Sequence, residues 1–269
     1  FIVQQRLMDI GYITKEATTQ FGYLTGLATS LVGLPVILTT SLAASLVPAV
    51  SELYALKKKS DIRKRAMTAM KISNIFTIPA CIGMAVLATP VSMLLYATPN
   101  AGPAITVMSL SIIFLGWQQV TAGVLQGLGR TVIPMLNIAV GLVIKIFLDW
   151  QWTAIPWLGI NGAAWASNIN FAMAACLNLY FVKRYVGSIL DVRVCIKILV
   201  SAFAMGGAAS FIYTSLFPIL GNILAVAITI IVAAFVYVAT LWLTKAVVYK
   251  DLYNFPVIGK RLRSKAGKK

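Results

Sequence analysis

Four long stretches of this 269-residue sequence contain no Asp, Glu, Lys or Arg. A helix that crosses the ~30 Å hydrocarbon core of a bilayer needs about 20 apolar residues. Two of the stretches fit one such helix each, and the other two fit two each. Because lipid offers no partner for backbone N–H and C=O groups, the crossings must be helical. The sequence therefore predicts an all-α, polytopic helical membrane protein. The stretches lie between Glu16 and Glu52, Lys71 and Arg130, Asp149 and Lys183, and Lys197 and Lys245.

Composition supports this class of protein and disfavours others. Hydrophobic residues make up 59% of the chain and charged residues only 11%, whereas a soluble domain is about 25% charged. The ~10-residue alternation of a transmembrane β-barrel is absent from the sequence. Cys81, Cys176 and Cys195 form no CxxC pair, and we expect them to be buried free thiols.

Pro, Gly and polar residues divide the apolar blocks into elements. Residues 1–8 are expected to be the end of a truncated helix, and a polar connection follows at 9–20. Because the sequence opens inside an apolar fragment without Met, we expect the C-terminal part of a longer protein. About seven full transmembrane helices are predicted near residues 24–51, 72–96, 103–126, 131–149, 158–182, 196–216 and 222–244.

Positive charge is concentrated in alternate connections between these spans. The segment ELYALKKKSDIRKRAMTAMK, residues 52–71, alone holds seven Lys and Arg. Together with Arg130, residues 183–197 and the tail from Lys245, one set of connections holds twenty, and the other set only Arg6 and Lys15. Charge that alternates in step with the spans follows the positive-inside rule and does not indicate nucleic-acid binding. We expect a multi-pass protein of the cell (inner) membrane with a cytoplasmic C-terminus and a basic cytoplasmic tail at 247–269.

The sequence offers little for catalysis. It contains no His, and its seven carboxylates are scattered, so it holds no acid–base pair and no metal-ligand cluster. The segment GLGRTV at 127–132 lacks the third glycine of a dinucleotide-binding turn. We predict no enzyme, no catalytic residue, no metal and no cofactor.

Charged residues inside the spans are the first candidate functional groups. Lys145 is costly at membrane depth, by ~2.5–3.5 kcal/mol on insertion scales, so such a residue usually faces a bundle interior or an aqueous cavity. The alternative is a Lys145 that snorkels and pairs with Asp149, four residues on. The two interpretations are compatible. Arg6 is a second candidate, with interfacial anchoring as its alternative.

Neutral amides inside or near the spans are the second group. They either make hydrogen bonds between packed helices or line a wet pathway. Those that we select as cavity candidates are Gln118, Gln119, Asn137 and Asn168; Asn170 and Asn178 belong to the same class.

Three segments resemble the multidrug/oligosaccharidyl-lipid/polysaccharide (MATE/MOP) flippase superfamily. The segment LPVILTTSLAASLVPAVSE at 34–52 resembles the end of the family's eighth helix. The segment GVLQGLGRTVIPMLNIAVGLVIKI at 123–146 resembles the following stretch in the polysaccharide-exporter branch of the family. The segment LGINGAAWASNI at 158–169 resembles the start of the next helix in that branch. The chain is most similar to the stage V sporulation protein B-like flippases, relatives of the lipid II flippases. The motif residues are Pro48, Ser51, Gln126, Gly127, Gly129 and Arg130.

The resemblance implies one lobe of a fourteen-helix transporter. Residues 1–185 would be the second lobe, with the end of helix seven and helices eight to twelve. Residues 186–246 would be two additional C-terminal helices, and the partner would be the missing N-terminal lobe. Lipid II relatives carry an Arg near the start of the eighth helix, where this chain has about Thr29.

The function implied by the resemblance is flipping by alternating access. The substrate would be a lipid-linked oligosaccharide or a peptidoglycan precursor, with a polyisoprenyl-pyrophosphate that moves from the inner to the outer leaflet for cell-wall or spore-cortex synthesis. Membrane lipids and this substrate are the expected partners, and nucleic acid is not one. A cation-coupled multidrug antiporter and a non-transporting scaffold for cell-wall enzymes are the alternatives.

Overall fold

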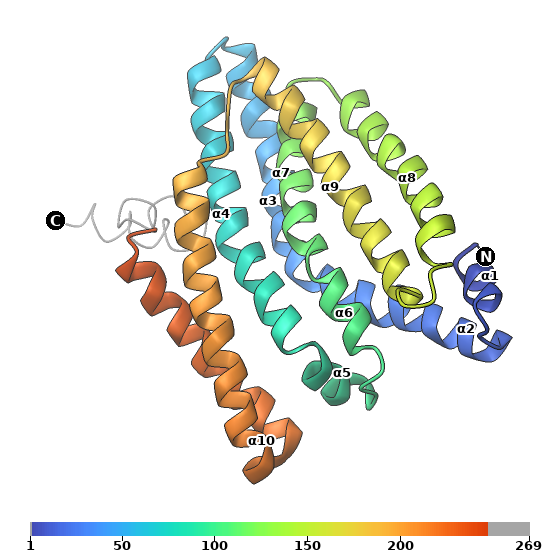
Figure 1. Cartoon of the computed structure of the whole chain (residues 1–269). Helices are drawn as coiled ribbons and strands as arrows, with labels where there is room; N and C mark the ends of the chain where they lie inside the picture. Colours follow the sequence, from blue (N-terminus) through green and yellow to red (C-terminus); the bar gives the residue numbers. More distant parts are fainter. Residues whose placement is uncertain (1, 247–269) are drawn as a thin grey trace.

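The computed structural model describes residues 2–246, and within this range the secondary structure is entirely helical (Figure 1). The elements are α1 (Ile2–Asp9), α2 (Thr14–Gly22), the π-helix η1 (Tyr23–Ala28), α3 (Thr29–Ala55), α4 (Lys59–Val86), α5 (Ala88–Tyr96), α6 (Gly102–Met108), α7 (Ser111–Gly127), α8 (Val132–Trp152), α9 (Ile160–Tyr185) and α10 (Val192–Leu243).

Helix α7 is the centre of the bundle and packs against α3, α4 and α9 (Figure 1). Small residues make this close packing possible, as in many membrane helices. A Cβ atom at Gly116 would lie within 3 Å of side-chain atoms of Ser73 and Thr77 on α4, and one at Gly123 would lie 2.9 Å from the Ala43 carbonyl oxygen on α3. Helix α8 packs on α9, and α10 packs on α4 and α5.

The chain is an all-α, polytopic membrane protein, as the charge-free stretches predict. Five helical segments of the described chain are long and apolar enough to cross a bilayer. One of them, α10, contains Gly221 with φ +70°, where its two halves meet at a kink. The number of seven full spans stays a prediction.

Four predicted boundaries were wrong. The span at 72–96 is interrupted at Leu87, because Pro90 in the first turn of α5 has no N–H for a bond to the carbonyl of residue 86. The span at 103–126 is interrupted at residues 109–110, between α6 and α7. The basic stretch 52–71 is mostly helical, with a turn only at 56–58, and α2 begins inside the predicted connection 9–20. Apolar sequence runs through both interruptions, so hydropathy alone does not reveal them.

The connections sort to two ends of the bundle. We call the end formed by residues 56–58, 128–131 and 186–191 the basic end (top of Figure 1). Helices α2 and α5, the α8–α9 connection and the bend of α10 lie at the opposite end. The predicted alternation of basic and neutral connections is thus confirmed for the described residues.

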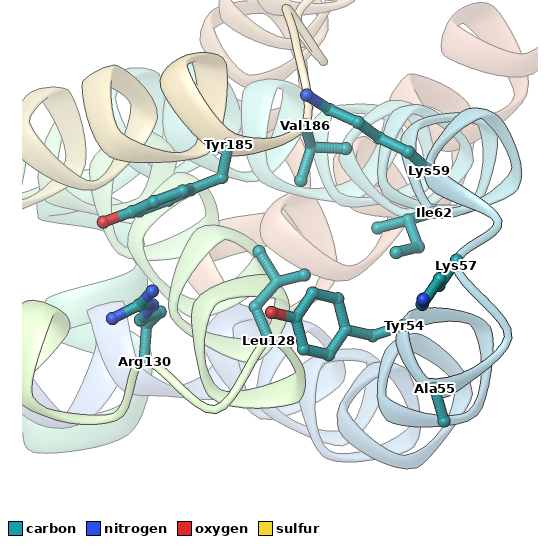
Figure 2. Close-up of a pocket in the computed structure, with 9 residues that line it drawn as sticks. All are labelled: Tyr54, Ala55, Lys57, Lys59, Ile62, Leu128, Arg130, Tyr185 and Val186. Carbon is teal, nitrogen blue, oxygen red and sulfur yellow. The ribbon is translucent and has the colours of Figure 1, made fainter.

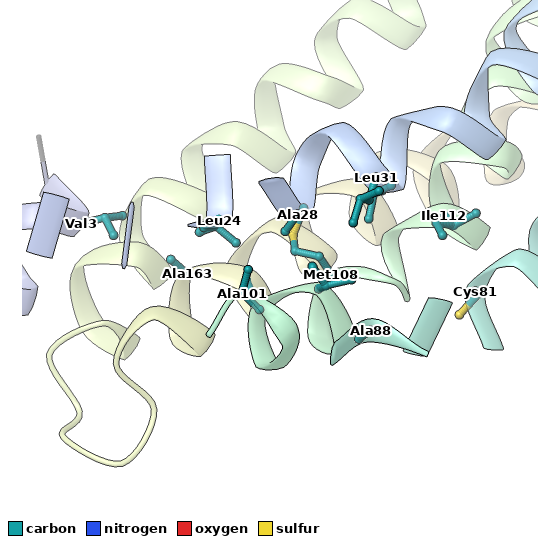
Figure 3. Packing of buried hydrophobic residues seen from close by; sticks show 14 of the residues in the cluster. Val3, Leu24, Ala28, Leu31, Cys81, Ala88, Ala101, Met108, Ile112 and Ala163 are labelled. Atoms are coloured by element: carbon teal, nitrogen blue, oxygen red, sulfur yellow. The ribbon is translucent and has the colours of Figure 1, made fainter. Parts of the chain in front are cut away.

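A core cluster binds the opposite end together. It joins Val3 of α1, Leu24 of η1, Met108 of α6 and Ala163 of α9 (Figure 3). Close packing of this kind fixes α1 against the bundle although α1 has only eight residues. The expectation of buried thiols is right for Cys81 and wrong for Cys176, which is exposed, and Cys195, which is half-buried. Position inside an apolar run does not tell a lipid-facing side chain from a core one.

Candidate functional site

The predicted pair on α8 is formed. Lys145 Nζ donates to Asp149 Oδ2 at 2.5 Å, and the side chains are 24% and 10% exposed. The spacing of four residues places both groups on one face of the helix. Asp149 Oδ1 is buried and has no hydrogen-bond partner among the described residues. The Asp149 carboxylate thus neutralises the charge of Lys145 through Oδ2, and its Oδ1 remains without a hydrogen-bond donor among the described residues. That Lys145 faces a transport cavity stays a prediction.

Arg6 joins the same part of the molecule from another helix. Its Nε donates to the Trp150 carbonyl oxygen on α8 at 2.9 Å, and its guanidinium lies 4.8 Å from the centroid of the Trp150 ring. Its Nη1 pairs with Asp9 Oδ2 at 2.7 Å. Lys145 and Arg6 therefore both lie near the C-terminal end of α8, each beside a carboxylate.

Two of the predicted amides make hydrogen bonds between helices. Asn137 of α8 donates to Asn178 Oδ1 of α9 at 2.7 Å. Asn168 of α9 donates to the Val107 carbonyl oxygen at 2.8 Å and accepts a bond from Ser111 Oγ at 2.5 Å. These contacts agree with the first of the two interpretations, in which amides hold packed helices together.

The other two amides, Gln118 and Gln119, are half-buried on α7. Gln118 Oε1 is buried without a partner among the described residues. A role of these side chains in a wet pathway stays a prediction.

The motif residues form a junction at the basic end. Ser51 Oγ on α3 donates to the Gly127 carbonyl oxygen at the end of α7, at 3.0 Å. A Cβ atom at Gly127 would lie 2.6 Å from Val50 Cβ, so this contact requires glycine. Gly129 has φ +72° and ends the helix, while the Arg130 N–H donates to the Leu125 carbonyl oxygen at 2.9 Å. The two segments that resemble family motifs, 34–52 and 123–146, are thus in direct contact. The motif residues Pro48 and Gln126 are exposed.

A hydroxyl-rich face runs along the helices from residue 14 to 55. Exposed Ser and Thr side chains there bond carbonyl oxygens of their own helix, for example Thr25 to Phe21 at 2.8 Å and Ser41 to Ile37 at 3.1 Å. Thr29 donates to the Leu24 carbonyl oxygen five residues back, across η1. Large apolar side chains are exposed among these hydroxyls as well, namely Leu34, Ile37 and Leu38. The exposed face of α10 includes Phe235 and Trp242.

Several polar contacts were not predicted from the sequence. Trp117 Nε1 donates to Asn74 Oδ1 at 2.6 Å, and Asn74 Nδ2 donates to Cys195 Sγ at 3.3 Å, which links α7, α4 and α10. Tyr237 Oη on α10 donates to the Ile75 carbonyl oxygen at 2.7 Å. A polar residue inside an apolar run was the available signal, but it does not identify the partner.

Comparison with known proteins gives consistent matches. Residues 25–151 match the MatE family. The chain is 31% identical over 203 residues to the uncharacterized membrane protein YabM of Bacillus subtilis, covering 72% of this chain and 38% of that protein. It is 28% identical over 263 residues to stage V sporulation protein B of the same organism, covering 96% of this chain and 50% of that protein.

Solved structures with the same fold include that of a flippase. The lipid II flippase MurJ, in an inward closed conformation, matches with a TM-score of 0.69 and 19% sequence identity, over 89% of this chain and 50% of that one. The chain spans about half the length of stage V sporulation protein B and of the solved flippase, and less of YabM.

Proposed function

From the match of residues 25–151 to the MatE family, we propose that the chain is one lobe of a flippase for a lipid-linked precursor. The substrate class is a lipid-linked oligosaccharide or a lipid II-like peptidoglycan precursor, moved from the inner to the outer leaflet by alternating access. The observation that carries the proposal is the structural match to the lipid II flippase, which extends over 89% of this chain and 50% of the flippase. Transport by such a lobe is movement of the substrate without a chemical reaction.

The distribution of polar groups supports this proposal. The apolar tail of the substrate stays in lipid, whereas its pyrophosphate and sugar need a substitute for water. The exposed hydroxyls at 14–55, including Thr25, Thr29 and Ser41, suit a cavity wall that meets both water and the apolar tail, because exposed Leu34, Ile37 and Leu38 lie among them. Exposed Phe235 and Trp242 on α10 suit contact with lipid. Lys145 supplies a cation for the anionic head.

Orientation and division of the lobe belong to the same proposal. The basic end would lie in the cytoplasm and the protein in the cell membrane, as the positive-inside rule predicts. Residues 1–185 would form the lobe and 186–246 the two additional helices. The predicted tail at 247–269 lies outside the described residues.

A cation-coupled antiporter is less well supported by the site. Such a protein needs an intramembrane carboxylate that can bind and release a cation. Within the described residues, Asp149 is the carboxylate that lies inside a candidate span and is buried. Lys145 already binds one of its two carboxylate oxygens. A non-transporting scaffold is distinguished by the transport assay that follows.

The proposal is tested by removing the cation from the protein that contains this chain. Lys145→Gln and the charge-retaining Lys145→Arg are reconstituted in vesicles with a fluorescent lipid-linked precursor, and transfer between leaflets is followed with a membrane-impermeant quencher. Loss of a charged hydrogen bond of ~1.5–3 kcal/mol should slow transfer by Lys145→Gln by about tenfold to a hundredfold. Lys145→Arg should retain most of the activity. The matched control, Lys64→Gln, removes an exposed lysine of α4 and should leave transfer unchanged.

Transfer by Lys145→Gln at the wild-type rate would remove this residue from the mechanism. If the wild-type protein itself moves no precursor while remaining folded, the scaffold hypothesis replaces the flippase.

A further inference from the structure

A pocket of about 410 Å³ lies at the basic end, between the α3–α4 turn, the α7–α8 turn and the end of α9 (Figure 2). Its wall includes Lys57, Lys59 and Arg130, together with Tyr54 and Tyr185. These residues come from three connections that are far apart in the sequence, and none of them belongs to the pair on α8. We call this cavity the basic pocket.

The charge of the basic pocket has one sign. No Asp or Glu lines it, and within the described residues none of its three cations forms a salt bridge. The Arg130 guanidinium lies 5.5 Å from the centroid of the Tyr185 ring, which holds the cation at the wall. Three positive charges without a counterion favour an anionic occupant.

A neighbouring pocket shows that this pattern is specific. It lies on the other side of the α3–α4 turn and is of similar size, about 440 Å³. There, Lys64 and Arg65 face Glu52 and Asp61, and Lys64 Nζ lies 3.4 Å from Asp61 Oδ1. Cations at the basic end are therefore not left without carboxylates everywhere.

Backbone geometry adds little to this charge. Helix α4 begins at Lys59 in the pocket wall, without a side-chain cap. The Lys59 N–H donates to the Lys57 carbonyl oxygen at 3.1 Å, and the Asp61 N–H donates to the Lys58 carbonyl oxygen at 3.0 Å. The three side-chain cations therefore carry the attraction for an anion.

Apolar groups complete the lining and favour a lipid as the source of the anion. Ile62, Leu128 and Val186 share the pocket with the cations. Tyr54 and Tyr185 lie at the ends of α3 and α9, where aromatic residues of membrane proteins meet the headgroup region. A free inorganic anion gains nothing from such a surface, whereas the first methylene groups of a phospholipid's acyl chains do.

We propose that the basic pocket binds the phosphate group of an anionic membrane lipid. Lys59 and Arg130 hold the phosphate oxygens from two sides, with Lys57 at the rim. The basic pocket contains none of the residues that the proposed function uses, so the proposal does not depend on that function.

The experiment compares two double variants with equal loss of charge. The chain is purified in neutral detergent and titrated with short-chain phosphatidylglycerol, with phosphatidylcholine of the same chain length and with inorganic phosphate. Bound ligand is counted by native mass spectrometry. The test variant is Lys59→Gln/Arg130→Gln, and the matched control is Lys64→Gln/Arg65→Gln, which removes one Lys and one Arg from the neighbouring pocket. Melting temperatures in neutral detergent confirm that both variants are folded.

Phosphatidylglycerol should bind the wild-type chain and the control with the same Kd. The test variant should bind it about thirtyfold more weakly, from ~1 kcal/mol for each cation near a membrane surface. Phosphatidylcholine should show no dependence on Lys59 and Arg130. If the double variant fails to fold, Arg130→Lys serves in its place because it keeps the positive charge. This variant should weaken phosphatidylglycerol binding by less than about fivefold.

Equal loss in the test and control variants overturns the proposal, because surface charge alone then accounts for binding. An equal effect on phosphatidylcholine overturns it as well. If binding of inorganic phosphate requires Lys59 and Arg130 but binding of phosphatidylglycerol does not, the ligand of the pocket is a free phosphate and the proposal is wrong.

Discussion

The cations near the C-terminal end of α8 and those of the basic pocket differ in their partners. Near the C-terminal end of α8, Lys145 and Arg6 each contact a carboxylate, at 2.5 Å and 2.7 Å. At the basic end, Lys59 and Arg130 line a pocket without any carboxylate. An ammonium inside a span needs a counterion from the chain itself, because water is scarce there. In the basic pocket, water or a headgroup serves instead, and Lys59 and Arg130 stay open to a ligand, whereas Lys64 at the same end pairs with Asp61 at 3.4 Å.

This contrast predicts that removing a carboxylate matters most on α8. Asp149→Asn leaves Lys145 largely desolvated without its counterion, and we expect a loss of about 3 kcal/mol in the free energy of unfolding, the low end of the range for breaking a buried pair. Unfolding in mixed micelles with increasing dodecyl sulfate measures the change. The matched control is Asp61→Asn at the basic end, whose partner Lys64 is 75% exposed at its side chain; there the loss should be below about 0.5 kcal/mol.

A second variant distinguishes the effect of an unpaired charge from the effect of lost side-chain packing on α8. Lys145→Met/Asp149→Leu replaces both charges with apolar groups and should recover most of the stability that Asp149→Asn loses. Equal losses for Asp149→Asn and Asp61→Asn would contradict the contrast between the ends.

Removal of Arg6 should have an intermediate effect. Arg6→Gln loses the partly exposed pair with Asp9 and the contact with the Trp150 ring. Together these contribute about 1–2 kcal/mol to the free energy of unfolding. The same micelle titration measures it, with Arg65→Gln as the control for a charge at the basic end. A stability of Arg6→Gln equal to that of the control would show that α1 is held by its apolar contacts alone.

The smallest effect is expected for the basic pocket. In neutral detergent Lys59→Gln/Arg130→Gln should change the free energy of unfolding by less than about 1 kcal/mol, because these cations have no carboxylate partner and contribute only the ring contact of Arg130. Addition of phosphatidylglycerol should then stabilise the wild-type chain and not this variant. A large loss already in neutral detergent would mean that the pocket residues have a structural partner.

Much of this architecture could be predicted from the sequence. Charge-free stretches locate the long helices, and alternating charge assigns the connections to two ends, because both effects depend on the bilayer and not on details of packing. The pair of Lys145 and Asp149 follows from their spacing of four residues on one helix. Local rules therefore suffice wherever the interaction is local or is imposed by the membrane.

The remaining features depend on contacts between distant segments. Ser51 and Gly127 were both singled out, but nothing in the sequence indicates that they bond each other. The basic pocket combines residues from three connections, so Tyr54 and Tyr185 carry no signal of a common site when read singly. The interruption at Leu87 has a local signal in Pro90, but Pro48 and Pro79 lie inside unbroken helices, so a proline alone does not predict an interruption.

The π-helix η1 has a consequence for the path of the hydroxyl-rich face. A π turn inserts one residue into a helix, which turns everything before it by about 100° relative to everything after it. The exposed hydroxyls of α2 and those of α3 therefore do not form one straight track. Deleting a single residue within 23–28 would restore regular winding, swing Thr18 and Thr19 to another azimuth and leave the register of α3 with α7 intact.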